Sequence, residues 1–578
     1  MLSLLTAEEN AMKKAFVTYK DFGAVGDGKA NDFFAIQAAH TYANENGLPV
    51  KADPSAMYLI GNTEKNGIAS SIIIKTDTDF CGASFIFDDT DIHYEPGEKK
   101  CYNTYPFSIS GDYEHITLSE EICKRLSENG GVKDGSLKKI DTRLGYPAML
   151  IVRCDDERVF IRYGGNQNSG DPKQELILVD ENGNVDKSTP FLFDYDKFTS
   201  ITAIRTDEKP ITVENGRFVT RASRVNVTKN VYLRRGISLQ RSNTVIRNLT
   251  HEIIGEIPKY AVVDENSNVL TGFKFDKDSG KVYSPDGTEI SDGSAKPFFG
   301  QAYAGFISFG YCNNVLIEHS TFQGRVYYLQ GTYDILGHLA NNVTFKKCIQ
   351  SNFLANDTPA LPLYPAMGKW WGIAGTNFCK NVTYDSCRLT RFDAHEGIVN
   401  GKIINSEIAA LRLTGGGNMH IEGTKFYNFM SSLVSLREDY GSTWRGTITI
   451  KDCEVLDTGK NSKLKNIVHS ASSNHWFGYP TYFPNIVIDN LKIENPQQEI
   501  NLACDYKSNP NSPYYYRGVS DPAISVSGGI CTDGKINENV YTPPKFIKVI
   551  NNEQNGYKIT LIDCNFFKDT QIEGAAKK

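Results

Sequence analysis

Apolar and polar positions alternate in short runs along most of the chain, which is typical of strands rather than helices. From about residue 300 one phrase returns, in which an asparagine precedes alternating β-branched or aromatic positions. Clear copies are NNVLIEHSTF from Asn313, NNVTFKKCIQ from Asn341 and KNVTYDSCRL from Lys380. Looser copies begin at Ser242, Gly401, Asn418, Gly446, Pro484 and Tyr557. The phrase predicts a repeated strand that follows a turn, where Asn tolerates a left-handed conformation.

The spacing of these copies predicts a coil of stacked strands. The small or turn residues that anchor the copies lie 17 to 39 residues apart, at Ser320, Cys348, Cys387, Ser406, Gly423 and Cys453. An irregular period with insertions favours a solenoid over a propeller, whose blades are larger and more uniform. Because several of the 12 cysteines occupy one position of the repeat, we interpret them as small core residues rather than disulfide partners. The sequence contains no C-x-x-C pair, so zinc and redox motifs are unsupported.

Two segments interrupt the strand pattern, and one helix precedes it. NDFFAIQAAHTYANENG, residues 31–47, has an apolar stripe and a terminal glycine, which predicts a helix that caps the open end of the coil. Residues 96–204 contain a helical pattern from His115 and long strand patterns, which predicts an inserted α/β-hairpin subdomain. The predicted organisation begins with an N-terminal extension at 1–15, a cap and first coils at 16–95, and the insertion at 96–204. A β-helix follows at 205–570 and carries a surface hairpin near 255–300. Residues 571–578 are predicted to be a tail.

The net charge and the hydropathy of the chain indicate which classes of binding partner are unsupported. The 578 residues carry a formal net charge of −6 and a mean hydropathy of −0.37, so nothing supports binding to nucleic acid or to an anionic membrane. No apolar run approaches the ~18–20 residues needed to span a bilayer. The start MLSLLTAEEN lacks the features of a signal peptide. We therefore expect a cytoplasmic protein, or a secreted one whose signal peptide is absent from this chain.

The segment VTYKDFGAVGDGKANDFFAIQAA near the N-terminus resembles the opening of the pectate-lyase-like superfamily of right-handed parallel β-helix proteins. The matching residues are Asp21, Phe22, Gly23, Ala24, Gly26, Asp27, Gly28, Asn31 and Asp32. The resemblance implies an all-β fold, a right-handed parallel β-helix (solenoid) with an N-terminal capping helix. That group includes lyases, hydrolases, epimerases and phage tailspikes, so the resemblance is weak for function. The N-T-D, D-D, G-H-G and R-I-K motifs of polygalacturonases and the calcium-binding aspartates and R-x-P-x-x-R of pectate lyases are absent, and no catalytic residue is transferred.

Charged and aromatic residues recur on a second short strand that precedes each Asn turn. If these strands stack as one parallel sheet with ~4.8 Å between neighbours, alternate side chains form a solvent-facing row. The predicted row consists of Asp334, Trp371, His395, Arg412, Arg437 and His469. The stretch TRFDAHEG adds Arg391 and Asp393, and LREDYGSTW adds Glu438, Asp439, Tyr440 and Trp444. We expect this face to be the floor of a binding site, with TGGG at 414–417 allowing close backbone approach.

Three functions compete, and the first is a polysaccharide lyase acting on a uronic-acid glycan. β-Elimination needs a base, a group that neutralises the substrate carboxylate, and an acid for the leaving oxygen. Arg412 and Arg437 suit the carboxylate, because a guanidinium fork can bind it at two points. His395 suits the base, and Tyr440 or His469 suits the acid. The lyase is the favoured interpretation because the row carries several cations.

The second function is a glycoside hydrolase or transglycosylase, which needs two carboxyl groups ~5–9.5 Å apart. Asp393 with Glu438 or Asp439 is the expected pair. The third is a non-catalytic glycan-binding or tailspike-like β-helix. In all three the partner is a polysaccharide or oligosaccharide, Asp334 and Arg391 contribute to binding, and Trp371, Trp444 and Trp476 stack on sugar rings. We expect a monomer or a homotrimer and no cofactor or metal, since no ligand set for calcium is recognisable.

Overall fold

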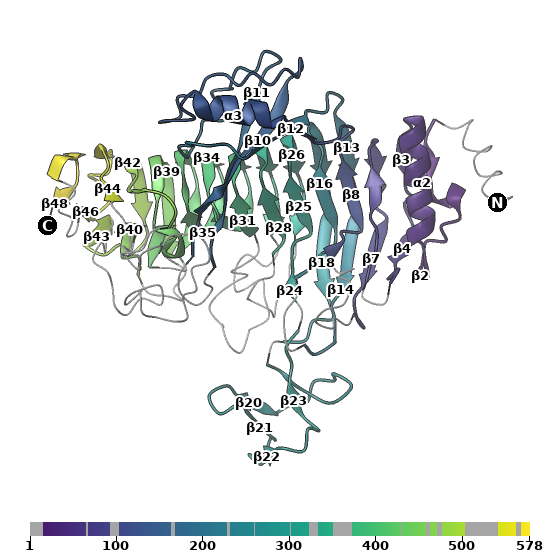
Figure 1. The fold of residues 1–578 in the computed structure, drawn as a ribbon. Coiled ribbons are helices and arrows are strands. Elements are labelled where there is room, and N and C mark those ends of the chain that lie inside the picture. Colours follow the sequence, from purple (N-terminus) through teal and green to yellow (C-terminus); the bar gives the residue numbers. More distant parts are fainter. Residues whose placement is uncertain are drawn as a thin grey trace.

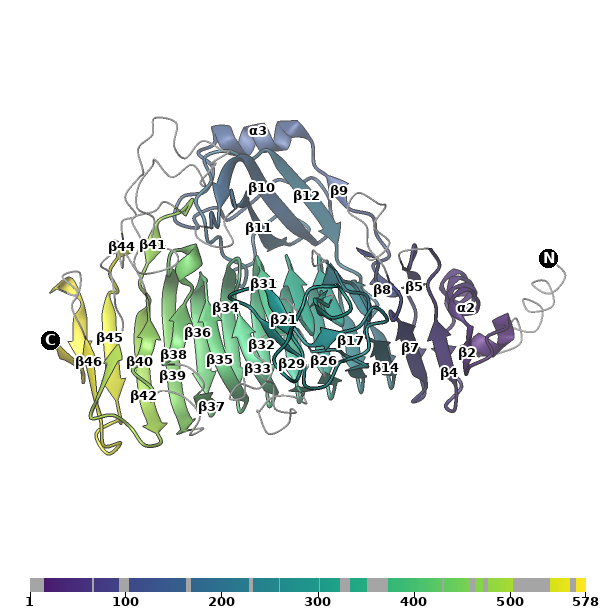
Figure 2. The same cartoon turned by 90° about the horizontal axis from the view of Figure 1, so that it is seen from below.

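The chain winds into a right-handed parallel β-helix whose coils stack along one axis (Figure 1). This computed structural model describes residues 15–64, 67–92, 103–162, 168–227, 232–258, 260–300, 302–322, 333–350, 373–428, 431–457, 463–470, 477–502, 541–561 and 568–577. The first and last coils lie at opposite ends of an elongated body, as Figures 1 and 2 show. The solenoid fold predicted from the repeats is confirmed.

Three stacks of parallel strands form the walls of the β-helix. The first sheet contains β1 (Val17–Thr18), β3 (Val50–Lys51), β6 (Thr78–Asp79), β13 (Ile211–Glu214), β17 (Thr244–Arg247), β26 (Asn313–Glu318), β29 (Asn341–Lys346), β32 (Cys379–Asp385), β34 (Ile398–Ile404), β36 (Gly415–Glu422), β39 (Trp444–Asp457), β42 (Asn485–Ile493), β45 (Phe546–Ile550) and β47 (Gln571–Glu573). The second contains β2 (Asp27–Asn31), β4 (Met57–Ile60), β7 (Ser84–Asp88), β14 (Arg217–Arg221), β18 (Thr250–Ile254), β27 (Thr321–Phe322), β30 (Ile349–Gln350), β33 (Arg388–Asp393), β35 (Glu407–Leu413), β37 (Lys425–Asn428), β38 (Ser432–Leu436), β40 (Asn466–His469), β43 (Glu499–Leu502), β46 (Lys558–Leu561) and β48 (Ala576–Lys577). The third contains β5 (Ile72–Ile74), β8 (Phe107–Ser110), β16 (Ile237–Gln240), β25 (Ile307–Gly310), β28 (Ile335–His338) and β31 (Ile373–Asn377).

The repeated asparagines form ladders at the turns, which explains the phrase in the sequence. Left-handed backbone occurs at Asn314, Asn342 and Asn381, with φ of 59°, 51° and 56°. Their amides bond between coils: Asn342 Nδ2 donates to Asn314 Oδ1 at 3.3 Å, and Asn381 Nδ2 donates to Asn341 Oδ1 at 2.7 Å. Asn therefore has two roles in the turn. It tolerates the left-handed backbone conformation, and its side-chain amide hydrogen-bonds to the neighbouring coil.

The interior of the first sheet is a column of apolar side chains in register. Val343 pairs with Val382, and further along Met419 pairs with Ile448. These side chains are buried, as are the repeated thiols of Cys348, Cys387 and Cys453. Gly401 falls in the same column, and the Met419 sulfur occupies the space where its side chain would lie. Removal of this column from water drives the coils to stack.

The predicted capping helix is α2 (Phe33–Asn46), which lies at the N-terminal end of the coil (Figure 1). Asp32 precedes it, and its carboxylate accepts hydrogen bonds from the backbone N–H of Val25 at 2.7 Å and of Gly26 at 3.1 Å. The aspartate thus holds the glycine-rich turn that carries the family resemblance. The short helix η1 (Tyr19–Phe22) packs beside α2.

The inserted subdomain is an antiparallel sheet with one helix, and it lies on one flank of the β-helix (Figure 2). Its elements are β9 (Ile116–Thr117), α3 (Glu120–Glu128), β10 (Ala148–Val159), β11 (Asp171–Val179) and β12 (Ser200–Arg205). Its apolar core continues into Leu339, Phe378 and Tyr440 of the β-helix. A buried ion pair crosses this seam, where Lys380 Nζ lies 2.9 Å from Glu175 Oε2.

Two boundaries differ from those expected. β8 pairs with β5 and β16 in the third sheet, so the insertion begins after residue 110 and not at 96. Strands β47 and β48 pair with β45 and β46, so the coil continues through residues 571–577, where a tail was expected. Both segments are too short for sequence alternation to distinguish a final strand from a loop.

The second insertion projects from the β-helix as a small group of hairpins (Figure 1). Its strands are β19 (Val262–Val263), β20 (Lys274–Asp276), β21 (Lys281–Tyr283), β22 (Glu289–Ile290) and β23 (Lys296–Pro297). Short parallel pairs also join β15 (Tyr232–Leu233) to β24 (Ala302–Tyr303), and β41 (Thr481–Tyr482) to β44 (Tyr541–Thr542).

Candidate functional site

A buried ionic network lies where β38 ends, and Arg437 is its centre. The chain turns there through the short helix η3 (Glu438–Tyr440). Arg437 donates from Nε to Asp439 Oδ1 at 3.1 Å and from Nη2 to Asp439 Oδ2 at 2.7 Å. Its Nη1 donates to Asp393 Oδ1 at 3.0 Å. Both edges of the guanidinium fork are therefore occupied by carboxylates.

The network extends in both directions from Arg437. Arg391 pairs with Asp393, and Arg162 Nη2 lies 2.6 Å from Asp439 Oδ2. Burial alone would raise the pKa of the Asp393 carboxyl, but Arg391 and Arg437 outweigh it and lower that pKa to about 2. The pKa of Asp439 is lowered in the same way, against its own burial, chiefly by Arg437. The aspartates stay ionised, and neither serves as a general acid.

These contacts correct the role expected for Arg437. Sequence analysis placed it on a solvent-facing row, where it would bind a substrate carboxylate. Arg437 is instead 5 % exposed, and two carboxylates of the protein already neutralise it. A guanidinium with both edges paired has no free fork for a uronate.

A second layer of side chains adjoins the network. His395 and Tyr440 share a hydrogen bond of 3.3 Å between Nε2 and the phenol oxygen. Burial, with help from Arg437, lowers the pKa of His395 to about 3, so the imidazole is neutral. Burial raises the pKa of Tyr440, which therefore remains a phenol. Beside them His469 Nδ1 lies 3.5 Å from Glu438 Oε1, and both side chains are half-buried.

Glu396 is the most perturbed carboxyl of this layer, and sequence analysis did not select it. It follows His395 on the loop between β33 and β34, with its Oε1 3.8 Å from His395 Nδ1. Burial raises its pKa to about 8, and the negative charge of the neighbouring Asp171 in the subdomain adds to the effect. A carboxyl group that is buried beside another negative charge keeps its proton to higher pH, so the raised pKa favours a protonated Glu396 at neutral pH.

The predicted outward row is only partly one row. Asp393, Arg412, Ser435 and His469 are successive partners across β33, β35, β38 and β40. Arg412 and His469 are half-buried on this row. Asp334 lies outside it, because it precedes β28 of the third sheet. It is fully buried and accepts a hydrogen bond of 2.9 Å from Gln350 Nε2.

Three further expectations concern binding residues. Trp444 is a core residue, fully buried, and its indole Nε1 donates to the carbonyl oxygen of Gly417 at 3.1 Å. It has no exposed face for a sugar ring, so its predicted stacking role is wrong. Arg391 is fully buried as well and acts through Asp393. Trp371 and Trp476 lie outside the described residues.

Two of the site residues that the sequence pattern did not predict come from the subdomain. Arg162 and Asp171 lie in or beside its strands, over 200 residues from the loop that they meet, and no local pattern marks them. Glu396 had a signal, since it adjoins His395. In the described part of the chain, no group of three or more His, Cys, Asp or Glu side chains could hold a metal ion. None of the helices in the described ranges is long and apolar enough to cross a membrane.

Comparison with known proteins shows likeness at the level of whole structures. No protein-family profile and no curated protein sequence matches the chain. A tailspike, Gp54 of Acinetobacter baumannii bacteriophage AP22, solved with capsular saccharide, is 12 % identical over 98 % of this chain and 79 % of its own, with a TM-score of 0.45. An exopolygalacturonase from Thermotoga maritima is 10 % identical over 98 % of this chain and 96 % of its own, with a TM-score of 0.32. The adhesin PfbA of Streptococcus pneumoniae is 11 % identical over 83 % of this chain and 89 % of its own, with a TM-score of 0.33.

Proposed function

We propose that this protein is a carbohydrate-active enzyme that hydrolyses glycosidic bonds, with Glu396 as the general acid. The observation that carries the proposal is the largely buried carboxyl of Glu396 beside His395, where the carboxylate of Asp171 from the subdomain is its neighbouring charge. A glycosidase needs one carboxyl group that is protonated at neutral pH to donate to the leaving oxygen. Glu396 fits that role, because its pKa is about 8.

A second carboxylate has to act on the sugar carbon or on a water. Asp171 is the neighbouring charge that raises the pKa of Glu396, so we do not assign this step to it. Asp393 and Asp439 are held in the buried arginine network. We assign the role of base or nucleophile to Glu438, which is half-buried beside His469 on the turn η3. This assignment replaces the expected pair of Asp393 with Glu438 or Asp439.

Elimination is the second candidate, and one contact favours it. The neutral imidazole of His395 shares a hydrogen bond with the Tyr440 phenol, so the imidazole would take the C5 proton and the phenol would give its proton to the leaving oxygen. The substrate carboxylate would then have to be neutralised by Arg412, since Arg437 is already paired.

The test is incubation with a panel of neutral and uronic-acid glycans, following new reducing ends and the ultraviolet absorbance of unsaturated products. Hydrolysis predicts reducing ends without that absorbance, and Glu396→Gln should lower turnover at least ~100-fold. Glu438→Gln should do the same. Glu407→Gln is the matched control, because that carboxylate pairs with Arg388 on the second sheet, outside the site, and should leave turnover unchanged.

Two outcomes would contradict the proposal. Unsaturated products that appear at an unchanged rate in Glu396→Gln would assign the reaction to elimination through His395. Glycan binding without cleavage of any substrate would make the protein a binding module.

A further inference from the structure

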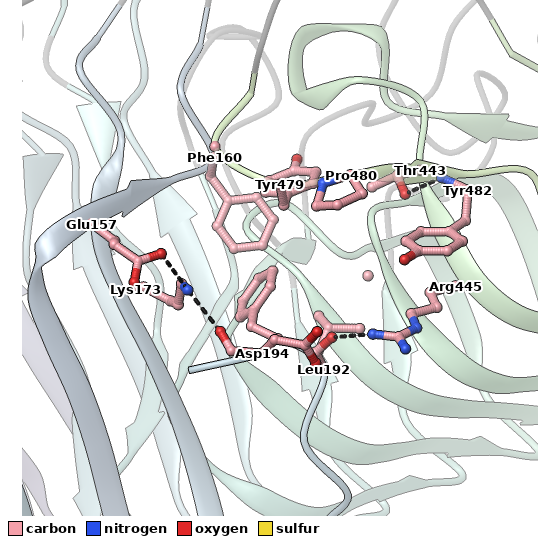
Figure 3. Close-up of a pocket in the computed structure, with 13 residues that line it drawn as sticks. Glu157, Phe160, Lys173, Leu192, Asp194, Thr443, Arg445, Tyr479, Pro480 and Tyr482 are labelled. Carbon is pink, nitrogen blue, oxygen red and sulfur yellow. Dashed lines mark hydrogen bonds and ion pairs between the residues drawn. The ribbon is translucent and has the colours of Figure 1, made fainter. Parts of the chain in front are cut away.

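A cavity of about 210 Å³ lies at the seam between the subdomain and the β-helix (Figure 3). The subdomain contributes Phe160 and Phe193 to its wall, and the segment before β41 contributes Tyr479. None of the proposed acid and base residues lines it. Its volume is below the ~300–1,000 Å³ of sites for drug-sized ligands, so it has room for one ring and not for a chain.

Aromatic rings form one part of the wall, and they are held in place. Phe160 and Tyr479 pack with their ring centres 5.1 Å apart, and Phe193 lies 5.9 Å from Tyr479. Tyr482 borders the cavity from β41, where its backbone N–H donates to Thr443 Oγ1 at 2.9 Å. Rigid aromatic rings with a polar edge suit a ligand that has an apolar face and a hydroxylated rim.

Charged groups form the rest of the lining, and their charges balance. Arg445 donates from Nη1 to the carbonyl oxygen of Leu192 at 3.2 Å, and its guanidinium lies 5.2 Å from the Tyr482 ring centre. Lys173 pairs with Glu157 and donates to the carbonyl oxygen of Asp194 at 2.7 Å. Arg445 also pairs with Asp134 at 3.0 Å, so both cations of the lining already have a carboxylate partner, which favours an uncharged ligand with several hydrogen-bonding groups.

We propose that this cavity binds one neutral pyranose ring, at a saccharide site separate from that of Glu396. The choice of a sugar as ligand rests on the proposed carbohydrate function. An apolar ring face would lie against Tyr482 and Phe193, and the hydroxyl groups would meet Arg445 and Asp194, all of which line the cavity.

The cavity and the candidate site share a wall. Phe160 packs edge-on against the Tyr440 ring at 5.9 Å, and the Tyr479 phenol donates to the Tyr440 carbonyl oxygen at 2.5 Å. A ring bound in the cavity is therefore one layer of side chains from Tyr440.

The experiment is saturation-transfer NMR of the whole chain with the methyl pyranosides of glucose, galactose and N-acetylglucosamine, and with glucuronic acid. A ring of this size in a good pocket binds with a Kd near ~1–10 mM. We expect at least one neutral pyranoside to bind, and glucuronic acid to bind more weakly. Tyr482→Ala should weaken binding about 10-fold by removing the ring contact.

Two further variants keep the test decisive. Leu192→Trp should fill the cavity and also abolish binding, which matters if Tyr482→Ala fails to fold. Glu396→Gln should leave pyranoside binding unchanged. Absence of binding by every probe, or binding that Glu396→Gln removes while Tyr482→Ala and Leu192→Trp do not, would overturn the proposal. Since the readout is binding, its failure is distinct from a failure to cleave glycans.

Discussion

Arg162 Nη2 lies 2.6 Å from Asp439 Oδ2, and this ion pair joins the inserted subdomain to the β-helix. Arg162 stands between β10 and β11, whereas Asp439 follows β38. Asp439 also accepts two hydrogen bonds from Arg437, so the pair belongs to a network and is not isolated. The docked subdomain therefore contributes a charged residue directly to the network of the candidate site.

Arg437→Ala should destabilise the protein. The change leaves Asp393 and Asp439 buried without their shared partner, and breaking a buried pair costs about 3–5 kcal/mol. Denaturant unfolding should show this loss. Arg388→Ala is the control, because its pair with Glu407 is one-third exposed and worth ~1 kcal/mol or less. Equal effects of the two changes would mean that Arg437 is not buried as described.

Lys380→Ala should loosen the subdomain. Lys380 is buried, and its Nζ contacts Glu175 Oε2 at 2.9 Å and the carbonyl oxygen of Pro190 at 2.5 Å. Removal of the ammonium leaves Glu175 buried across the seam, at a cost of about 3–5 kcal/mol. Limited proteolysis should cut between 111 and 206 faster than in the parent. The double variant Lys380→Met/Glu175→Gln should restore part of the resistance to proteolysis. If neither Lys380→Ala nor the double variant differs from the parent, the seam holds without this ion pair.

The Glu396 carboxyl should give the protein a measurable pH dependence. Its pKa in the folded chain, about 8, exceeds the usual value of 4.5, so folding favours the protonated form. This contribution to stability is complete below about pH 4.5 and is lost as pH rises through about 8. The unfolding free energy of the parent should fall relative to Glu396→Gln between these values, and turnover should fall above the upper one. Parallel stability curves would refute the raised pKa.

Val382→Asp should abolish folding. Val382 is 1 % exposed in the apolar column of the first sheet, and a buried unpaired carboxylate costs several kcal/mol. Expression as soluble protein and melting temperature are the measurements. Thr383→Asp is the control, because its side chain points to the opposite face of the same strand. A soluble Val382→Asp with the parent melting temperature would reverse the assignment of the faces.

Gly415→Ala should destabilise the coil beside the site. Gly415 has φ of +133°, and an added Cβ would lie 2.1 Å from the Ile398 carbonyl oxygen. Gly82→Ala is the control, and it measures the cost of the backbone conformation without a steric clash. Gly82 also has a positive φ, but no atom lies within 4 Å of the added Cβ. The control should cost about 1–3 kcal/mol and Gly415→Ala clearly more. Similar melting temperatures would mean that the coils separate freely at this point.

The sequence by itself determined the solenoid. Strand alternation, the Asn at each turn and the small residue at each anchor are local features, and each coil repeats them, so their sum indicates the stack. The capping helix and the subdomain helix were also predicted, since their apolar stripes and terminal glycine are local signals. For the same reason the stretch around His395 was recognised as a concentration of chemistry.

Only the tertiary structure decided which of those side chains face solvent and what they meet. A shift of one residue reverses the face of a strand, so Arg437 and Trp444 could not be assigned an orientation from spacing alone. Arg162 and Asp171 reach the site through the docked subdomain, across a sequence separation that no periodicity spans. The raised pKa of Glu396 and the lowered pKa of Asp393 arise from burial and neighbouring charges, which exist only once the coils and the subdomain have packed together.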